Sequence, residues 1–318
     1  FEPAAGFRCR FDVAGHILGS ATLRCELLAA SGRGNAVIRF SGDLGRGNHP
    51  LLLPPAPVGD ADLLVVESTY GDREHDEVDP VDRLADLICR TVDRDGVVVI
   101  PSFAVDRADV VLFQLARLAE QGRLPRVPVF VDSPMALAAL DIYRKSIEQG
   151  RADVRTELRG QADVFGVPGI REVHDTDGSR AISARAHAAV VIAGAGMATG
   201  GRVVHHLEHF LPDPKNSVAL VGFQAAGTRG RALLDGEDML KMHGRYVRVR
   251  AEIADLTGFS VHADRSELLD WVATADREPA AVYVVHGEDH AARSLASGIK
   301  ARDWPAVVPA HGERVRIG

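Results

Sequence analysis

The sequence predicts an α/β protein in which a β-rich start and an α/β end flank an inserted block of alternating strands and helices. Residues 7–40 contain short strand-like runs separated by glycine-containing turns. From residue 61 to residue 234, short apolar runs alternate with segments of helical periodicity. Alternation of this kind predicts a mostly parallel sheet with helices on its faces.

The elements follow from these patterns in chain order. Three strands of a meander are expected at 7–13, 21–28 and 36–40, followed by a buried strand at 61–66. The inserted block begins with a helix at 79–93, where Leu84, Leu87, Ile88 and Val92 share one helical face. Its strand and helix pairs are expected at 96–100 and 107–120, 127–131 and 135–148, 188–193 and 201–210, and 217–221 and 230–234. The last segment should hold strands at 246–253 and 281–285 and helices at 266–274 and 291–301.

Composition excludes several classes of protein. With 37 basic and 44 acidic residues the net charge is −7, which excludes a protein that coats nucleic acid through bulk positive charge. The longest uncharged stretch, residues 186–201, is shorter than the roughly 20 apolar residues of a spanning helix, so we expect no membrane association. Cys9, Cys25 and Cys89 have neither disulfide-framework nor zinc-knuckle spacing, which favours the cytoplasm.

Polar residues stand at the ends of apolar strands, where catalytic groups are often placed. His16, Asp43, Glu67 and His286 each follow a predicted strand, and His262 directly precedes the predicted helix at 266–274. Imidazole and carboxylate ligands bind Zn²⁺ and can leave a position for water. The pattern is therefore compatible with a hydrolytic metal site.

Two other patterns leave alternatives open. His205 and His209 stand at i and i+4 on one predicted helix and could share a metal, although a structural role is favoured because no carboxylate or cysteine completes the pair at helical spacing. The glycine run at 194–201 follows a strand, but its Gly-x-Gly-x-x-x-Gly spacing is too long for a dinucleotide fingerprint. It predicts either a helix start that binds a phosphate together with Arg202 or a tight strand-to-helix turn.

Eight short strings lie along the chain at 14–20, 40–45, 67–71, 131–136, 196–202, 222–228, 259–264 and 285–288. Their residues and order resemble the beta-CASP branch of the metallo-β-lactamase superfamily, the RNA-processing nucleases. The resemblance covers nearly the whole chain. It implies a split metallo-β-lactamase-like αββα domain, missing its N-terminal part, at 1–73 and 242–318, with an inserted beta-CASP α/β domain of mostly parallel sheet at 74–241.

The resemblance also implies roles for the strand-end residues. His16 would ligate a first zinc ion, Asp43 would bridge two zinc ions, and His286 would ligate the second. Glu67 would orient His262, which would contact the scissile phosphate and help to protonate the leaving oxygen. A histidine at position 286 is the pattern of the RNA-directed members.

RNA phosphates are expected to bind at glycine-rich turns and nearby guanidinium groups in strings that resemble family motifs. Because the net charge is −7, RNA binding must come from a local, positively charged site. The competing interpretation is that the arginines pair with acids such as Asp106, Asp109 or Glu208. The expected phosphate-binding residues are Arg107, Gly196, Gly200, Gly201, Arg202 and Arg229.

The sequence departs from the family in its metal motif. The string His-x-His-x-Asp-His does not occur in the 318 residues, so His16, Asp43 and His286 leave each of two zinc ions with only two protein ligands. We expect that the N-terminal part of a longer parent carries the missing ligands and that this chain alone binds zinc weakly. Asp106, Ala195 and Phe223 stand where the family usually has Gly, Ser and Tyr.

The sequence thus predicts zinc-dependent hydrolysis of RNA phosphodiester bonds by a complete parent, with single-stranded RNA as the partner. A catalytically silent RNA-binding or scaffolding relative is the main alternative, and a zinc hydrolase of small molecules is disfavoured by the inserted domain. The sequence leaves open endonuclease against exonuclease cleavage, the RNA sequence preferred, and whether the protein is a homo-oligomer.

Overall fold

The structure, a computed structural model, describes residues 1–28, 35–75, 79–184 and 187–315. The chain forms two compact units. The first comprises Phe1–His75, Ala152–Thr156 and Val261–Gly318, and the second comprises Asp76–Arg151 and Glu157–Ser260. The sequence predicts a return to the first unit at residue 242, but residues 242–260 belong to the second unit because β12 (Glu252–Asp255) joins that unit's sheet.

The first unit is built on a mixed six-stranded sheet with the order β1-β2-β3-β4-β13-β14. β1 and β3 are both antiparallel to β2, whereas β4 is parallel to β3 and β13 is parallel to β4. The carboxyl ends of β1, β3, β4 and β13 therefore lie at one edge of the sheet. The strand bounds are Phe7–Val13 (β1), Ala21–Leu27 (β2), Ala36–Phe40 (β3), Leu63–Val66 (β4), Ala281–Val284 (β13) and Ala306–Val307 (β14).

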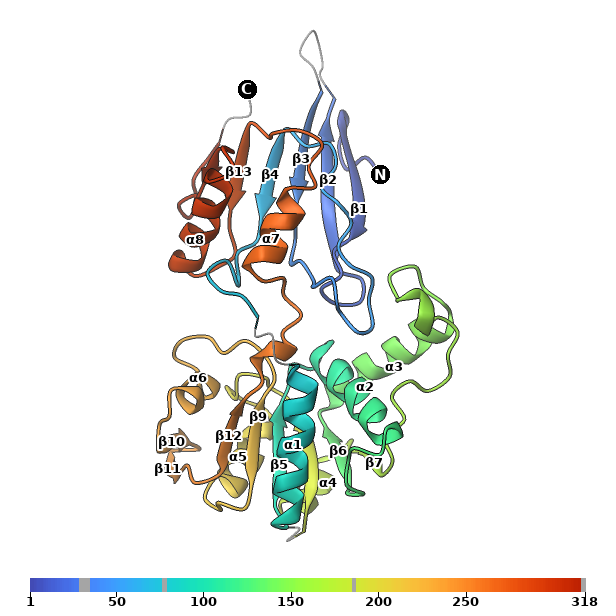
Figure 1. The fold of residues 1–318 in the computed structure, drawn as a ribbon, viewed down its shortest axis with the longest axis vertical. Helices are drawn as coiled ribbons and strands as arrows, with labels where there is room; N and C mark the ends of the chain where they lie inside the picture. The colour runs from blue at the N-terminus through green and yellow to red at the C-terminus, as the bar shows by residue number, and fades with distance from the viewer. Residues whose placement is uncertain (29–34, 76–78, 185–186, 316–318) are drawn as a thin grey trace. The chain divides into compact units, whose positions relative to one another are not determined.

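Two helices, α7 (Arg265–Val272) and α8 (Asp289–Lys300), pack on this sheet (Figure 1). Leu268, Val272, Leu295 and Ile299 from these helices meet the apolar side chains of β4 and β13 in one buried core. Three of the four residues of β4 are buried, whereas burial alternates along β13.

The second unit contains a six-stranded sheet with the order β12-β9-β5-β8-β6-β7, and every pairing in it is parallel. The central strands are buried on both faces, as the continuous apolar runs predict. The remaining strand bounds are Val97–Pro101 (β5), Val129–Asp132 (β6), Ile170–Glu172 (β7), Ala189–Ala193 (β8) and Ser217–Leu220 (β9).

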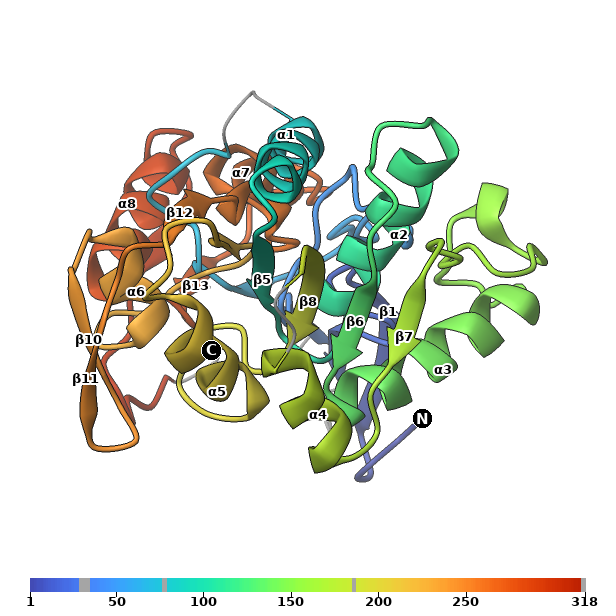
Figure 2. The same cartoon turned by 90° about the horizontal axis from the view of Figure 1, so that it is seen from below.

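Helices cover both faces of this sheet, with α1 and α2 on one face and α4 and α5 on the other (Figure 2). Among the described residues, no helix combines the length and apolarity needed to span a bilayer. The helix bounds are Pro80–Asp93 (α1), Arg107–Glu120 (α2), Pro134–Glu148 (α3), Thr176–Ser183 (α4), Arg202–Phe210 (α5) and Arg229–Leu234 (α6), with 3₁₀ turns at Thr156–Leu158 and Thr257–Phe259.

The strands predicted at 246–253 are present, but they belong to two different sheets. Residues Met239–Met242 (β10) and Arg245–Arg248 (β11) form a hairpin, and the chain then enters β12 in the main sheet. The turn between β10 and β11 has two residues, His243 and Gly244, both with positive φ. This is the backbone of a tight hairpin turn, which β-rich composition alone does not locate.

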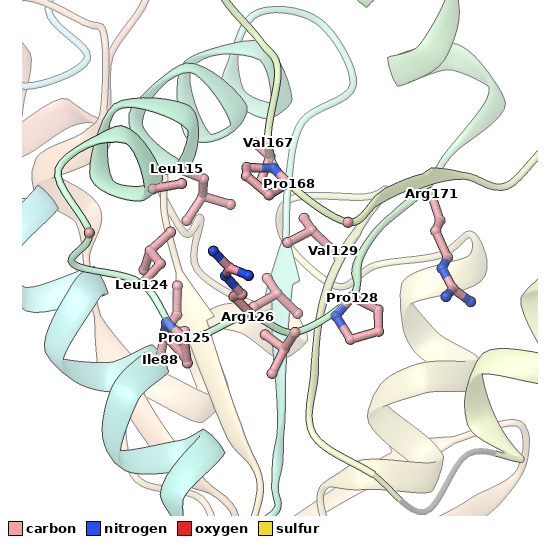
Figure 3. Close-up of a pocket in the computed structure, with 15 residues that line it drawn as sticks. Ile88, Leu115, Leu124, Pro125, Arg126, Pro128, Val129, Val167, Pro168 and Arg171 are labelled. Atoms are coloured by element: carbon pink, nitrogen blue, oxygen red, sulfur yellow. The ribbon is translucent and has the colours of Figure 1, made fainter.

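A cavity of about 610 Å³ lies in the second unit beside the start of β6 (Figure 3). Its wall is mainly aliphatic, with Ile88, Leu115, Leu124 and Val129 among the lining residues. The lining residues that the structure describes include arginines but no histidine, cysteine or carboxylate. This cavity therefore lacks the groups that acid–base or metal chemistry requires.

Candidate active site

The strand-end residues predicted from the sequence meet at one edge of the first unit's sheet. One ligand atom each from His16, Asp43 and His262 lie within 4.8 Å of one another, and the same holds for Asp43, Glu67 and His286. The rings of His16 and His262 are 4.1 Å apart. Because Asp43 belongs to both groups, the five residues form one cluster, which we call the catalytic cluster after the roles predicted for these residues from the sequence.

Close backbone contacts hold the loops of this cluster together. Gly45 lies so near the β1–β2 loop that a Cβ atom there would stand 1.8 Å from the Gly15 carbonyl oxygen. The Gly45 amide donates to the Ala14 carbonyl at 2.8 Å, and Gly45 forms an isolated bridge with His262. A residue with a side chain at position 45 would separate the loops that carry His16, Asp43 and His262.

Glu67 is a buried carboxylate that orients His262. It is 1% exposed, and its Oε1 lies 3.3 Å from His262 Nδ1 and accepts a hydrogen bond from the Leu44 amide at 2.6 Å. Burial alone raises the pKa of Glu67, but hydrogen bonds from His262, Thr69 and Leu44 hold that pKa below its usual value. Glu67 is therefore ionised and fixes the proton of the His262 ring on Nδ1.

His286 follows β13, which pairs with β4, so it lies next to Glu67 at the sheet edge. Its Nδ1 is 3.1 Å from Asp43 Oδ1, and its side chain is 62% exposed. The Ser68 hydroxyl donates to the Val285 carbonyl at 2.8 Å and joins the two strand ends. This open side of the cluster is accessible to a substrate.

Comparison with known proteins places this geometry in a family. Residues 109–233 match the family model of the Beta-Casp domain, and residues 246–314 match that of the Zn-dependent metallo-hydrolase RNA specificity domain. The chain is 35% identical to Ribonuclease TTHA0252 of Thermus thermophilus over 96% of this chain and 69% of that protein. The chain belongs to the beta-CASP family of metallo-β-lactamase proteins.

Other curated relatives carry different names. An RNase J-like protein of Methanocaldococcus jannaschii is 29% identical over 95% of this chain and 69% of its own length. The transcription termination factor FttA of Pyrococcus horikoshii is 35% identical over 90% of this chain but only 44% of its own length. The chain thus spans about two thirds of the first two relatives and less than half of the third.

The catalytic cluster fits the metal that the family implies. Its donor set consists of imidazoles and carboxylates, the ligands that Zn²⁺ takes in hydrolytic sites. Asp43 belongs to both groups of donors, so it could serve ions held by either group. His16, Asp43 and His286 are the residues of this chain that would hold such ions.

In the second unit, which contains the residues that match the Beta-Casp family model and which we call the beta-CASP unit, four of the predicted phosphate-binding residues lie together. Gly200, Gly201, Arg202 and Arg229 line a cavity of about 920 Å³, which we call the α5 cavity. Gly201 is the residue directly before α5. The structure therefore brings a glycine-rich turn and two guanidinium groups into one hollow.

Both of these arginines also hold the fold. Arg202 donates to Asp132 Oδ1 at 2.7 Å and to the Val173 carbonyl at 3.1 Å. Arg229 donates to the carbonyls of Lys241 at 2.8 Å and Ala198 at 3.1 Å. The acid paired with Arg202 is thus Asp132 rather than the acids considered from the sequence.

Arg107 and Gly196 lie elsewhere in the beta-CASP unit. Arg107 is 6% exposed, and its guanidinium donates to the Phe259 carbonyl. A Cβ atom at Gly196 would lie 2.6 Å from the Phe103 ring, so this glycine permits close packing. The local geometry thus assigns packing roles to both residues. Phosphate contacts at these two positions stay predictions.

Sequence reasoning missed residues that support the site. His75 Nε2 lies 3.0 Å from the His262 carbonyl, and the His75 amide donates to Asp264 Oδ2 at 3.2 Å. Asp264 and Glu267 form a capping box at the start of α7, directly after His262. The Asp-x-x-Glu spacing was the available signal for this helix start, whereas nothing in the sequence pointed to His75.

Proposed function

We propose that this chain provides part of the active site of a metal-dependent ribonuclease that hydrolyses RNA phosphodiester bonds. The observation that carries the proposal is the catalytic cluster, in which a buried carboxylate orients His262 beside metal-type ligands. The relatives named ribonuclease and RNase J-like protein support RNA as the substrate. So does the RNA specificity domain that matches residues 246–314.

His16, Asp43 and His286 would hold zinc, which when bound supplies Lewis acidity toward a phosphate oxygen and toward water. Glu67 keeps the His262 ring in one orientation with a proton on Nδ1, which leaves Nε2 to exchange a proton with the leaving oxygen. His75 fixes the backbone of His262 from the other side. These residues form a positioned acid–base pair in a site with one open side.

RNA would be gripped at the α5 cavity through backbone N–H groups of the Gly200–Gly201 turn and through Arg229. Single-stranded RNA suits such a site because a single strand exposes its backbone to separate guanidinium groups. Arg202 pairs with Asp132, so it would contribute to phosphate binding only the positive charge that Asp132 does not neutralise. We propose a cytoplasmic location, as the cysteine pattern predicts. A homo-oligomer stays a prediction.

The test uses a labelled single-stranded RNA and the protein as its gene encodes it, with and without Zn²⁺. Wild type should cleave the RNA, and Asp43→Asn should remove cleavage while RNA binding is retained, since Asp43 is the residue shared by both donor groups. His187→Ala, an exposed histidine of the second unit, is the matched control. Binding without cleavage in wild type would instead support the silent RNA-binding relative.

A further inference from the structure

A second group of metal-type ligands lies far along the chain from the catalytic cluster, on the wall of the α5 cavity. One ligand atom each from His205, Glu208 and His243 lie within 4.8 Å of one another. We propose that these three residues bind a divalent transition-metal ion, for which Zn²⁺ is the probe. The ion would join α5 to the β10–β11 hairpin.

The helix presents two of the ligands on one face. His205 and Glu208 are three residues apart on α5, so both side chains point to the same side of the helix. Val204 and Leu207 occupy the opposite, buried face and pack into the core of the unit. The apolar face therefore fixes the rotation of α5 and turns His205 and Glu208 toward the cavity. Di-iron bundle proteins hold metal with a Glu and a His three residues apart on one helix, in the order Glu-x-x-His, and the same spacing occurs here in the reverse order.

The hairpin turn supplies the third ligand. His243 has φ of 44° and Gly244 has φ of 81°, and Met242 pairs with Arg245 across the turn. A two-residue turn of this kind is rigid and sets the place of the His243 ring. That ring stacks on the His205 ring at 4.3 Å, and its Nδ1 lies 2.8 Å from Glu208 Oε2. Two chain segments thus converge on one point.

The donor set selects the kind of ion. Two imidazoles and one carboxylate are a typical zinc set, whereas Mg²⁺ and Ca²⁺ prefer oxygen ligands. In a tetrahedral site with bonds of about 2.0–2.1 Å, ligand atoms stand roughly 3.4 Å apart, and the three ligand atoms here already lie within 4.8 Å of one another. The ion would take the place of the proton that His243 and Glu208 share.

The charge around the cluster is compatible with one cation. Glu208 pairs through Oε1 with Arg245 at 3.5 Å, while its Oε2 faces His243. The two carboxylate oxygens can therefore serve the arginine and the metal at the same time. Binding would fasten the hairpin to α5 beside Gly200 and Gly201, which line the same cavity.

The experiment is equilibrium dialysis of the purified chain against Zn²⁺, followed by measurement of bound metal by mass spectrometry. His205→Ala and His243→Ala should each weaken one class of zinc site by more than about 100-fold, since loss of a supporting partner alone costs 10–100-fold. His187→Ala is the matched control, because it removes an exposed histidine of the same unit whose nearest acid is 3.7 Å away. It should bind as wild type does.

Two further measurements separate this site from the catalytic cluster. The loss caused by His243→Ala should persist in an Asp43→Asn background, where the catalytic cluster is already disabled. Zn²⁺ should also slow amide hydrogen exchange in the β10–β11 hairpin of wild type, but not of His205→Ala. Unchanged zinc content in both histidine variants, or a loss that disappears in the Asp43→Asn background, would overturn the proposal.

Discussion

Glu67 and His262 act as a pair because the buried Glu67 carboxylate has the His262 ring as one of its few hydrogen-bond donors, beside the amides of Leu44 and Thr69. The carboxylate is buried, and the ring that faces it is only 17% exposed. An ionised carboxylate in such a place must keep its hydrogen-bond donors, since an unpaired buried charge is strongly unfavourable. Local stability and the orientation of the His262 ring thus depend on the same contact.

Replacing His262 should lower turnover far more than RNA binding. His262→Ala removes the acid and leaves the α5 cavity unchanged, so the cleavage rate should fall on the order of 10²–10⁴-fold while the Kd for RNA stays within a factor of two to three. Single-turnover cleavage and fluorescence anisotropy measure the two quantities. A wild-type cleavage rate would remove His262 from the mechanism.

His75 should behave as a positioning residue. Its ring contacts the His262 carbonyl rather than the cluster itself, so His75→Phe should reduce turnover less than His262→Ala does. His75→Gln, which keeps a donor able to reach that carbonyl, should recover part of the loss. If His75→Gln and His75→Phe have equal rates, the contact is merely packing.

Asp109 gives the second unit a stability that depends on pH. Burial, together with the nearby Asp106 carboxylate, raises the pKa of Asp109 to about 8. An unfolded chain loses this proton near pH 4, so the folded state holds a proton that the unfolded state lacks between about pH 4 and 8. The free energy of unfolding should therefore fall as pH rises through this window and level off above it.

Asp109→Asn tests this prediction because it keeps an oxygen to accept from the Asp106 amide, which now donates to Asp109 Oδ2 at 3.1 Å. Urea unfolding at pH 5 and pH 9 should show a smaller loss of stability for the variant than for wild type. Equal losses would place the pH dependence elsewhere in the protein.

At the scale of elements, Asp132 joins three segments of the beta-CASP unit. This carboxylate at the end of β6 is fully buried and contacts His206 of α5 at 2.6 Å, the Ser179 hydroxyl of α4 and the Arg202 guanidinium. Asp132→Ala should destabilise the unit by about 3–5 kcal/mol, the usual cost of stranding a buried partner. Asp177→Ala, which removes a 93% exposed carboxylate, is the control for the same urea experiment.

Arg229 at the start of α6 is the better test of phosphate binding, because Arg202→Ala would also break the pair with Asp132. Arg229→Ala should reduce the slope of log K against log salt by about 0.7, the value for one contact to single-stranded nucleic acid. Arg231→Ala is matched to it, since Arg231 lies on the same helix and pairs with Asp235. Equal slopes for wild type and Arg229→Ala would assign Arg229 to packing alone.

Most elements of both sheets were predictable because long apolar periodicities survive in the fold. The prediction of helix 107–120 is confirmed, and the helix at 79–93 differs from α1 by one residue. Two elements were not predicted: β7 has only three residues, and α4 has only two apolar side chains, Ala181 and Ile182, which are too few to show a period. The strands predicted at 246–253 are present, but their division between a hairpin and the main sheet was not predictable, because both lie in one β-rich stretch.

Some residues of the site were likewise predictable from the sequence, and others were not. Strand-end residues such as His16 and Asp43 were predictable, since parallel strands bring their carboxyl ends to one edge. His75 and His243 were not, because each contacts residues far away in the chain. Asp132 lay within a motif that resembles the family, yet its partners come from two other elements.

At the scale of the whole molecule, the number of ligands limits metal binding. The catalytic cluster offers His16, Asp43 and His286 as ligands within this chain. The 318-residue chain should therefore hold zinc weakly at this cluster and show little nuclease activity. Metal analysis after exchange into metal-free buffer checks this, and two tightly held zinc ions that are lost in Asp43→Asn would contradict it.

The insertion of one unit into the other also sets the order in which the protein can be built. His262 and Glu67 are 195 residues apart in the chain. At about 5–20 residues per second, a ribosome needs roughly 10–40 s to make the segment between them. During that interval β4 of the nascent chain lacks its neighbour β13 and exposes an unpaired edge. The catalytic cluster is thus complete only when synthesis has passed His286, so a chain released earlier carries no intact site.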